Sequence, residues 1–235
     1  MSLSMLSDHR LAPPLPPVCR AAALEGLRAR VGHIKRRHTP RDAVTLCPGI
    51  DGWLPDHGLA RGGMHEVLAA DQGAATGFCA VVLGRLGGTV AWIGPEPDAA
   101  PQGLAWFGLE PSRLLFIEVG KASDALWAME EALRCPALAG AVLASPPLGS
   151  TTTRRLQLAT EIGGSLGLVL LPNEVAVAPT TALTRWRVGS DGTTPERNEL
   201  RNRTSRWQLD LLRARGGRPG CWSVSWEPST HSLVG

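Results

Sequence analysis

The sequence of 235 residues predicts an α/β fold, a mainly parallel sheet with helices on both faces, extended by C-terminal antiparallel strands. Between residues 64 and 172, short continuous apolar segments alternate with helical segments. This alternation is typical of parallel strands buried on both faces. After residue 184, apolar and polar residues alternate, and RGGRPG at 215–220 separates the last two such segments, which indicates a β-hairpin.

The chain is expected to divide into three parts. Residues 1–19 are expected to form a flexible leader, because four of the five residues at 13–17 are proline and cannot be helical. Residues 20–41 are expected to form a helix, in which apolar residues recur at spacings of three and four. Its apolar stripe consists of Leu24, Leu27, Val31 and Ile34. Residues 42–235 are expected to form the core together with its C-terminal hairpin.

The elements of the core follow in order. Short apolar runs predict strands at 64–70, 89–94, 113–119, 139–145 and 166–172. Helices are expected between them at 76–86, 99–107, 123–135 and 151–164. Ser123 is expected to be the N-cap of the third helix, and paired glycines are expected to end the fourth. The C-terminal strands are expected at 185–188, 206–214 and 221–227.

Composition excludes several classes of protein. With 43% hydrophobic and 19% charged residues, the chain has the balance of a globular protein rather than a disordered one. Its five cysteines form no CxxC pair, which argues against a disulfide framework or a zinc site. No apolar run is long enough to cross a membrane, and the first residues show no secretory signal pattern. We therefore expect a cytoplasmic protein without membrane contact.

Charge is distributed unevenly along the chain. Residues 1–41 carry eight basic against two acidic residues, residues 42–184 seven against fourteen, and residues 185–235 nine against five. An acidic middle is thus flanked by two basic ends. The basic ends are where we expect an acidic partner or nucleic acid to bind.

The first strand-to-helix turn of an α/β protein is the usual site for nucleotide phosphates. A working phosphate loop has the pattern GxxxxGK followed by Ser or Thr, in which lysine neutralises the phosphate and the hydroxyl ligates magnesium. Here both glycines and the lysine are replaced by alanine, and an aspartate adds repulsive charge. The vestigial site consists of Ala69, Asp71, Gly73, Ala74, Ala75 and Thr76 in this turn, together with Glu96 after a later strand.

Other groups needed for catalysis are also missing. The strand at 139–145 ends in Ala144 and Ser145, where a magnesium-binding aspartate is normally found. Glu96 follows the strand at 89–94 and is placed to act as a general base, but a lone glutamate cannot hold the nucleotide. HExxH and GxSxG patterns are absent, so neither a metalloprotease nor a serine hydrolase is indicated. We expect no catalysis, no bound cofactor and no metal.

The order of the elements resembles the RecA core, in the segments MHEVLAADQGAAT (64–76) and TVAWIGPE (89–96). In this resemblance Glu96 falls on the position of the catalytic glutamate of RecA. Five segments carry a more specific likeness: LPDHGLARGGMHEV (54–67), DALWAMEEALR (124–134), RRLQLATE (154–161), TRWRV (184–188) and RWQLDLLRARGGRPGCWSVSWE (206–227). In these segments the chain resembles the ImuA family.

The resemblance implies a RecA-like fold and a role in SOS-induced translesion DNA synthesis. It implies as partners an ImuB-like homologue of Y-family polymerases, RecA and an error-prone DnaE-type polymerase, with a weak DNA contact also open. The chain would then be a non-catalytic subunit that bridges these proteins. Two alternatives remain: an ATP-binding RecA paralogue that holds nucleotide through Thr76 and Glu96, and a SulA-like cell-division inhibitor.

Arginine and tryptophan gather in the C-terminal strands, a composition found both in protein interfaces and in surfaces that bind single-stranded nucleic acid. We expect the face shared by Trp222, Val224 and Trp226 to be core. The arginines remain open between protein partner, nucleic acid and solvent. They are Arg185, Arg187, Arg206, Arg213, Arg215 and Arg218. The stripe of the N-terminal helix packs on its own domain or docks on a neighbouring subunit.

Overall fold

The computed structural model describes residues 43–94, 100–173, 179–192 and 205–235. The chain forms two compact units, Met1–Thr39 and Pro40–Gly235, and all described residues belong to the second. Several sequence predictions therefore lie outside the described residues. They are the leader at 1–19, the helix at 20–41 with Leu24, Leu27, Val31 and Ile34, and the glutamate Glu96.

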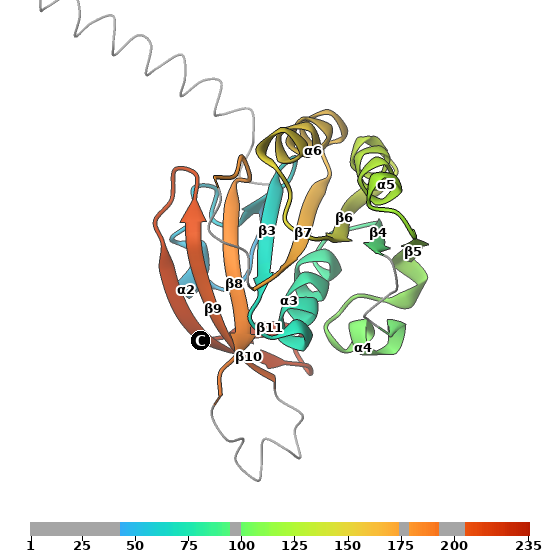
Figure 1. The fold of residues 1–235 in the computed structure, drawn as a ribbon. Helices are drawn as coiled ribbons and strands as arrows, with labels where there is room; N and C mark the ends of the chain where they lie inside the picture. Colours follow the sequence, from blue (N-terminus) through green and yellow to red (C-terminus); the bar gives the residue numbers. More distant parts are fainter. Residues whose placement is uncertain (1–42, 95–99, 174–178, 193–204) are drawn as a thin grey trace, which may run out of the picture. The chain divides into compact units, whose positions relative to one another are not determined.

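Among the described residues, nine strands form one sheet in the order β11-β10-β9-β8-β3-β7-β6-β4-β5 (Figure 1). The parallel strands are β3 (Met64–Ala69), β4 (Thr89–Gly94), β5 (Leu114–Glu118), β6 (Leu138–Ala144), β7 (Leu166–Pro172) and β8 (Thr184–Ser190). The antiparallel strands are β9 (Ser205–Ala214), β10 (Gly220–Glu227) and β11 (Ser232–Val234). A separate two-stranded sheet pairs β1 (Ala43–Val44) with β2 (Leu59–Ala60).

The predicted change from parallel to antiparallel strands is confirmed, but it comes one strand later than expected. The strand predicted at 185–188, now β8, was expected to be part of the antiparallel edge. It pairs with β9 in antiparallel fashion but runs parallel to β3. Thr184, the first residue of β8, lies level with His65 near the start of β3, and β8 therefore takes the same direction as the core strands.

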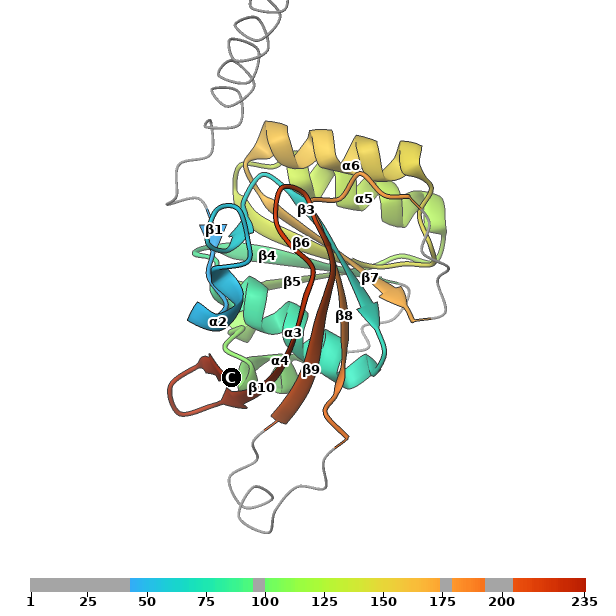
Figure 2. The ribbon, with the colours of Figure 1, turned by 90° about the vertical axis from the view of Figure 1, so that its left-hand side faces the viewer.

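Helices cover both faces of the sheet. Figure 2 shows α5 and α6 as a layer on one side and α3 on the other. Two apolar cores result, one between the sheet and α3 and one between the sheet and the α5/α6 pair. The helical elements are α2 (Pro48–Asp51), α3 (Gln72–Gly84), α4 (Pro101–Trp106), the 3-10 helix η2 (Pro111–Arg113), α5 (Ala122–Arg134) and α6 (Ser150–Gly163).

The expected helix ends are partly confirmed. Gly164 follows α6 with φ 70°, the left-handed conformation that glycine adopts without strain, so the predicted stop holds. The predicted cap of α5 is wrong, because Lys121 occupies the N-cap position. Ser123 lies one residue inside the helix, where its hydroxyl donates to the carboxylate of Asp124.

The tryptophans of the C-terminal strands pack mainly into the core on the α3 side. Trp186 and Trp226 are almost completely buried, and the ring of Trp186 lies 5.7 Å from that of Phe78, between centroids. The prediction that the face with Val224 and Trp226 is core is confirmed. Trp222, on the same face, is half-buried and meets Trp186 at 6.2 Å.

Candidate functional site

The turn after β3, where phosphate would bind, is tied to the neighbouring strand. The backbone N–H groups of Ala70 and Asp71 both donate to the carbonyl of Val188 on β8, at N–O distances of 2.9 and 3.2 Å. In a phosphate loop such N–H groups face the anion. A Cβ added at Gly189 would lie 3.1 Å from that of Ala70, so β8 packs closely against the turn.

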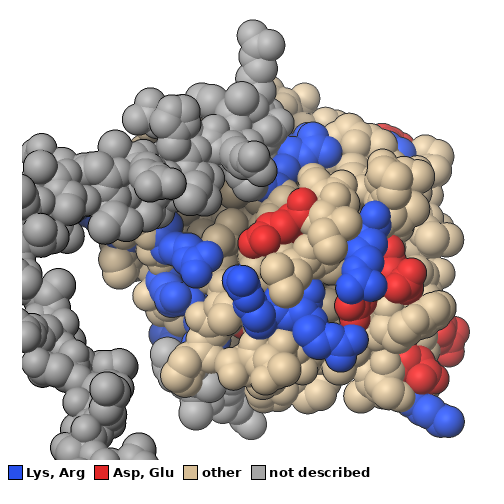
Figure 3. All heavy atoms as spheres, turned by 90° about the horizontal axis from the view of Figure 1, so that it is seen from above, with Lys and Arg blue, Asp and Glu red and all other residues tan. Residues whose placement is uncertain are grey.

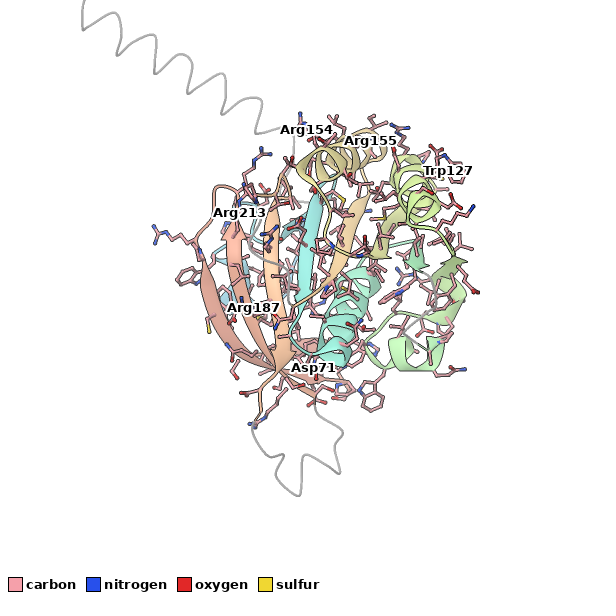
Figure 4. The ribbon with its side chains drawn as sticks, viewed as in Figure 1. Asp71, Trp127, Arg154, Arg155, Arg187 and Arg213 are labelled. Atoms are coloured by element: carbon pink, nitrogen blue, oxygen red, sulfur yellow. The ribbon has the colours of Figure 1, made fainter. Side chains whose placement is uncertain are left out.

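The start of α3 is already capped by a side chain of the protein. Asp71 is the N-cap residue, with extended backbone angles, and its Oδ1 accepts a hydrogen bond from the N–H of Ala74 at 2.7 Å. A carboxylate here satisfies a free N–H and interacts favourably with the helix dipole. For this reason α3 begins at Gln72, four residues before the predicted start at residue 76. Figure 4 shows Asp71 at this end of the sheet.

The remaining positions of the vestigial site are ordinary residues of β3 and α3. Ala69, Ala74 and Ala75 are buried and contribute to the core on the α3 side, whereas Gly73 is exposed. The hydroxyl oxygen of Thr76 is buried and has no hydrogen-bond partner among the described residues. The turn therefore offers an aspartate and three alanines where a phosphate loop offers glycines and a lysine.

We expect Asp71→Ala to lower the free energy of unfolding by about 1 kcal/mol, because it removes the cap of α3. Urea denaturation monitored by circular dichroism measures this change. Asp71→Asn is the matched control, since asparagine retains the acceptor oxygen and should keep most of the stability. Equal losses in both variants would show that the capping hydrogen bond does not stabilise α3.

The strand that normally supplies a magnesium ligand ends without an acidic residue. At the end of β6, the N–H of Ser145 donates to the carbonyl of Leu170 on β7 and its hydroxyl donates to the carbonyl of Pro146. Within the described part of the chain, no three His, Cys, Asp or Glu residues gather as they would around a metal ion. None of the helices described there has the length and apolarity needed to span a membrane.

A pocket of about 610 Å³ lies at the carboxyl ends of β5, β6 and β7, where open α/β sheets usually bind ligands. Its lining is mainly apolar and contains no acidic residue. The polar side chains that line it are few, namely those of Gln72, Lys121, Ser145 and Thr152.

The His-Glu pair near the start of β3 is buried, and both side chains are hydrogen-bonded. His65 contacts the hydroxyl of Thr184 through Nδ1 at 2.8 Å and donates through Nε2 to the carbonyl of Ala60 at 3.0 Å. The indole N–H of Trp186 donates to the same hydroxyl at 2.9 Å. Burial lowers the pKa of His65 from 6.5 to about 4, only partly opposed by the bond to Ala60. The imidazole therefore serves as a neutral structural link between β2, β3 and β8.

Because folding keeps His65 neutral, acidification should destabilise the protein. The unfolded chain binds a proton near pH 6.5 and the folded chain only near pH 4. The free energy of unfolding is therefore unaffected above pH 6.5 and falls by about 3 kcal/mol as the pH drops from 6.5 to 4. Urea denaturation at pH 7.5 and pH 5 tests this, with His65→Gln as the non-titrating control. An identical pH dependence in both proteins would contradict the assignment.

Glu66 points to the other face of β3 and forms a buried ion pair with Arg185. The Nε of Arg185 donates to one carboxylate oxygen of Glu66 at 2.6 Å, and the hydroxyl of Thr180 donates to the other at 2.6 Å. Arg185 is only 5% exposed. The expectation that Arg185 contacts a partner is therefore wrong, because its guanidinium neutralises the buried carboxylate of the adjacent strand.

The other predicted arginines fall into separate places. Arg213, Arg215 and Arg218 are exposed near the β9–β10 hairpin, and Arg213 also donates to the carbonyls of Thr180 and Ala182. Arg206 is exposed at the opposite end of β9, about 23 Å away for seven residues of extended strand. Arg187 is half-buried on β8 (Figure 4). The structure thus brings three of the six arginines together.

One surface was missed by the sequence interpretation, the outer side of α5 and α6. Trp127 on α5 and Leu158 and Ile162 on α6 are exposed despite their apolar character. Arg154 and Arg155 lie beside them on α6 (Figure 4). The sequence did contain a signal for this surface. Arg154, Leu158 and Ile162 follow one another at one-turn spacing, and none of them belongs to the buried side of α6.

Comparison with known proteins gives both a sequence relative and a fold relative. No family model matches the chain. The chain is 32% identical over 202 residues to Protein ImuA of two strains of Caulobacter vibrioides, covering 78% of this chain and 83% of the relative. Among solved structures, the RadB recombinase superposes with a TM-score of 0.59 at 13% identity, covering 79% of this chain and 96% of that chain. The second match shows the fold, which is RecA-like.

Proposed function

The chain belongs to the ImuA family, and from this premise we propose that it is a non-catalytic, RecA-like accessory subunit of an SOS-induced translesion synthesis complex. In this role it binds an ImuB-like protein, RecA and an error-prone DnaE-type polymerase and holds them together. The partners follow from the family resemblance. The non-catalytic character rests on the turn after β3.

The observation that carries the proposal is the occupied start of α3. The carboxylate of Asp71 caps the N–H of Ala74, and the preceding N–H groups are bound to Val188. A nucleotide phosphate would have to displace this carboxylate and would find no lysine to neutralise it. Retention of a RecA-like fold without a phosphate cradle favours a binding role over ATP hydrolysis.

The hairpin arginines offer one binding surface for this role. Arg213, Arg215 and Arg218 lie in or beside the tight β9–β10 turn and are exposed. Arginine is over-represented among residues that contribute strongly to interfaces. The surrounding C-terminal segment, residues 185–235, carries a surplus of basic residues, which suits an acidic partner surface.

Co-purification with an ImuB-like partner tests the proposal. The wild-type chain should retain the partner, and the double variant Arg213→Glu/Arg215→Glu should retain it about tenfold less strongly. Arg206→Glu/Lys121→Glu makes the same change in net charge away from the hairpin and is expected to bind normally. Failure of the wild-type chain to bind would overturn the proposed function, and equal binding by both variants would exclude the hairpin as the contact.

A second candidate is an unconventional nucleotide site that uses Thr76. It is favoured by one observation, the buried hydroxyl of Thr76 that lacks a hydrogen-bond partner among the described residues. Glu96, the other residue assigned to such a site, lies outside the described residues. Direct titration with nucleotide separates the two candidates.

A further inference from the structure

The pocket at the carboxyl ends of β5, β6 and β7 combines an apolar lining with a single charged side chain. Its volume of about 610 Å³ lies within the range of about 300–1,000 Å³ that small-molecule sites span. Lys121 is the one charged side chain among the described residues that line it. The apolar side chains come from several elements and include Val119, Leu126, Leu148 and Leu170. The lining therefore suits a ligand with an apolar body and one anionic group.

Acidic residues lie near the pocket but outside its lining. Glu118 ends β5 and Asp124 lies in the first turn of α5, and both are exposed. Asp71 is also outside the lining, and its carboxylate caps α3. Figure 3 views the molecule from above, and basic and acidic atoms lie side by side over the described part of this face. The outer surface is therefore of mixed charge, whereas the described lining of the pocket offers a cation and no carboxylate.

Two helices begin at the pocket, and their starts are not capped by side chains. The N-cap residue is Lys121 in α5 and Gly149 in α6, and among the described residues no side chain bonds to either start. Both N-cap residues line the pocket, as do Ala122 and Thr152 in the first turns. The first N–H groups of a helix have no partner within the helix and carry partial positive charge. An anionic group in the pocket would satisfy them.

The start of α3 gives a contrast at the same edge of the sheet. There the chain supplies its own carboxylate, because Oδ1 of Asp71 accepts a hydrogen bond from the N–H of Ala74 at 2.7 Å. No such carboxylate is present where α5 and α6 begin. Within the described part of the chain, the ammonium of Lys121 and the hydroxyl of Thr152 also make no hydrogen bond or ion pair. The pocket thus gathers donors that have no acceptor from the described residues.

We propose that this pocket binds a small apolar carboxylate, of the kind of a medium-chain fatty acid. The carboxylate would lie between the ammonium of Lys121 and the start of α6, and its chain would cover the apolar lining. A phosphate monoester carries about two negative charges at pH 7, whereas the described lining supplies one full positive charge. A carboxylate therefore matches the lining better. The site goes beyond the proposed function and does not depend on it, because none of the proposed partner contacts lies in the pocket.

Decanoate is the probe for this site. Isothermal titration of the full chain should show saturable binding of decanoate, at least about tenfold tighter than that of decylammonium, which has a chain of the same length and the opposite charge. Hexanoate should bind at least about tenfold more weakly than decanoate, because each methylene that is buried adds to the affinity. Equal affinities for decanoate and decylammonium would overturn the proposal.

Two variants locate the carboxylate. Lys121→Met removes the ammonium, keeps an apolar side chain and should weaken decanoate binding about tenfold. Gly149→Asp places a carboxylate at the N-cap of α6, where a Cβ meets no atom within 4 Å and the backbone is extended, with φ −69° and ψ 158°. Aspartate is a preferred N-cap residue, so this variant should stay as stable as the wild type. It should nevertheless bind decanoate at least about tenfold more weakly, because it occupies the N–H groups and repels the ligand.

Matched controls separate this effect from general damage. Gly87→Asp introduces the same charge at an exposed glycine outside the lining, where a Cβ also meets no atom within 4 Å. Arg206→Met removes an exposed cation of β9. Both should bind decanoate like the wild type, and urea denaturation checks that all four variants are folded.

Three results would overturn the proposal. The first is normal decanoate binding by both Lys121→Met and Gly149→Asp. The second is an equal loss in Gly149→Asp and Gly87→Asp, which would mean that binding responds to charge anywhere on the chain. The third is displacement of decanoate by micromolar ATP with magnesium, which would make the pocket a nucleotide site. Co-purification with the ImuB-like partner is measured separately, so failure of the proposed function would leave the result for the pocket unchanged.

Discussion

Replacement of Arg185 by methionine should lower the free energy of unfolding by about 3–5 kcal/mol. The substitution removes the guanidinium that donates to Glu66 at 2.6 Å. Glu66 is 3% exposed, so its carboxylate would remain in the core, and among the described residues the hydroxyl of Thr180 would be its one remaining side-chain partner. Burial of an uncompensated charge is among the most costly changes that a single substitution can make. Urea denaturation at neutral pH measures the loss.

The double variant Glu66→Leu/Arg185→Met is the decisive control. With both charges removed, no buried charge is left unpaired, and most of the lost stability should return. If the double variant is as unstable as Arg185→Met alone, the loss comes from packing rather than from the unpaired carboxylate. This result would contradict the role assigned to the ion pair.

Trp186→Ala is expected to lower the free energy of unfolding by a similar amount, about 3–5 kcal/mol. The indole is completely buried between the sheet and α3, where its ring lies 5.7 Å from that of Phe78 and 6.2 Å from that of Trp222. Its N–H also donates to Thr184, which in turn contacts His65. The substitution creates a cavity and removes one partner from a buried hydrogen-bonded group.

Trp186→Phe separates these two effects, because it keeps most of the ring volume and removes only the N–H donor. It should cost about 1–3 kcal/mol, less than the alanine variant. Trp53→Ala, at a tryptophan that is 43% exposed, should cost less than Trp186→Ala. Equal losses in Trp53→Ala and Trp186→Ala would contradict the central position of Trp186 in the core.

Much of the fold could be predicted because the core strands are continuous apolar runs. The segments TVAWIG and LGLVLLP form β4 and β7 with the predicted bounds. Continuous apolar segments of this kind are typical of strands in a sheet that is covered on both faces. The start of α3 was placed four residues late. Alanine and glycine in the turn carry little apolar periodicity, so the capping role of Asp71 had no signal in the pattern itself.

Sequence periodicity did not show which partners the charged residues of the predicted sites contact in the fold. Arg185 lies on a strand, and strand alternation places it on one face without showing that Glu66 of a strand far away in sequence lies opposite. Arg206 and Arg213 belong to one predicted strand. Because seven residues of extended strand separate them, they lie at opposite ends of β9 and do not form one cluster. The α5/α6 surface needed the packing of two helices, which sequence spacing alone does not determine.

The turn after β3 is expected not to hold a nucleotide. Isothermal titration of the full chain with ATP and magnesium measures this, with Thr76→Ala as the comparison. No saturable heat is expected up to about 1 mM nucleotide, in either protein. Saturable binding in the low micromolar range that is lost in Thr76→Ala would contradict it.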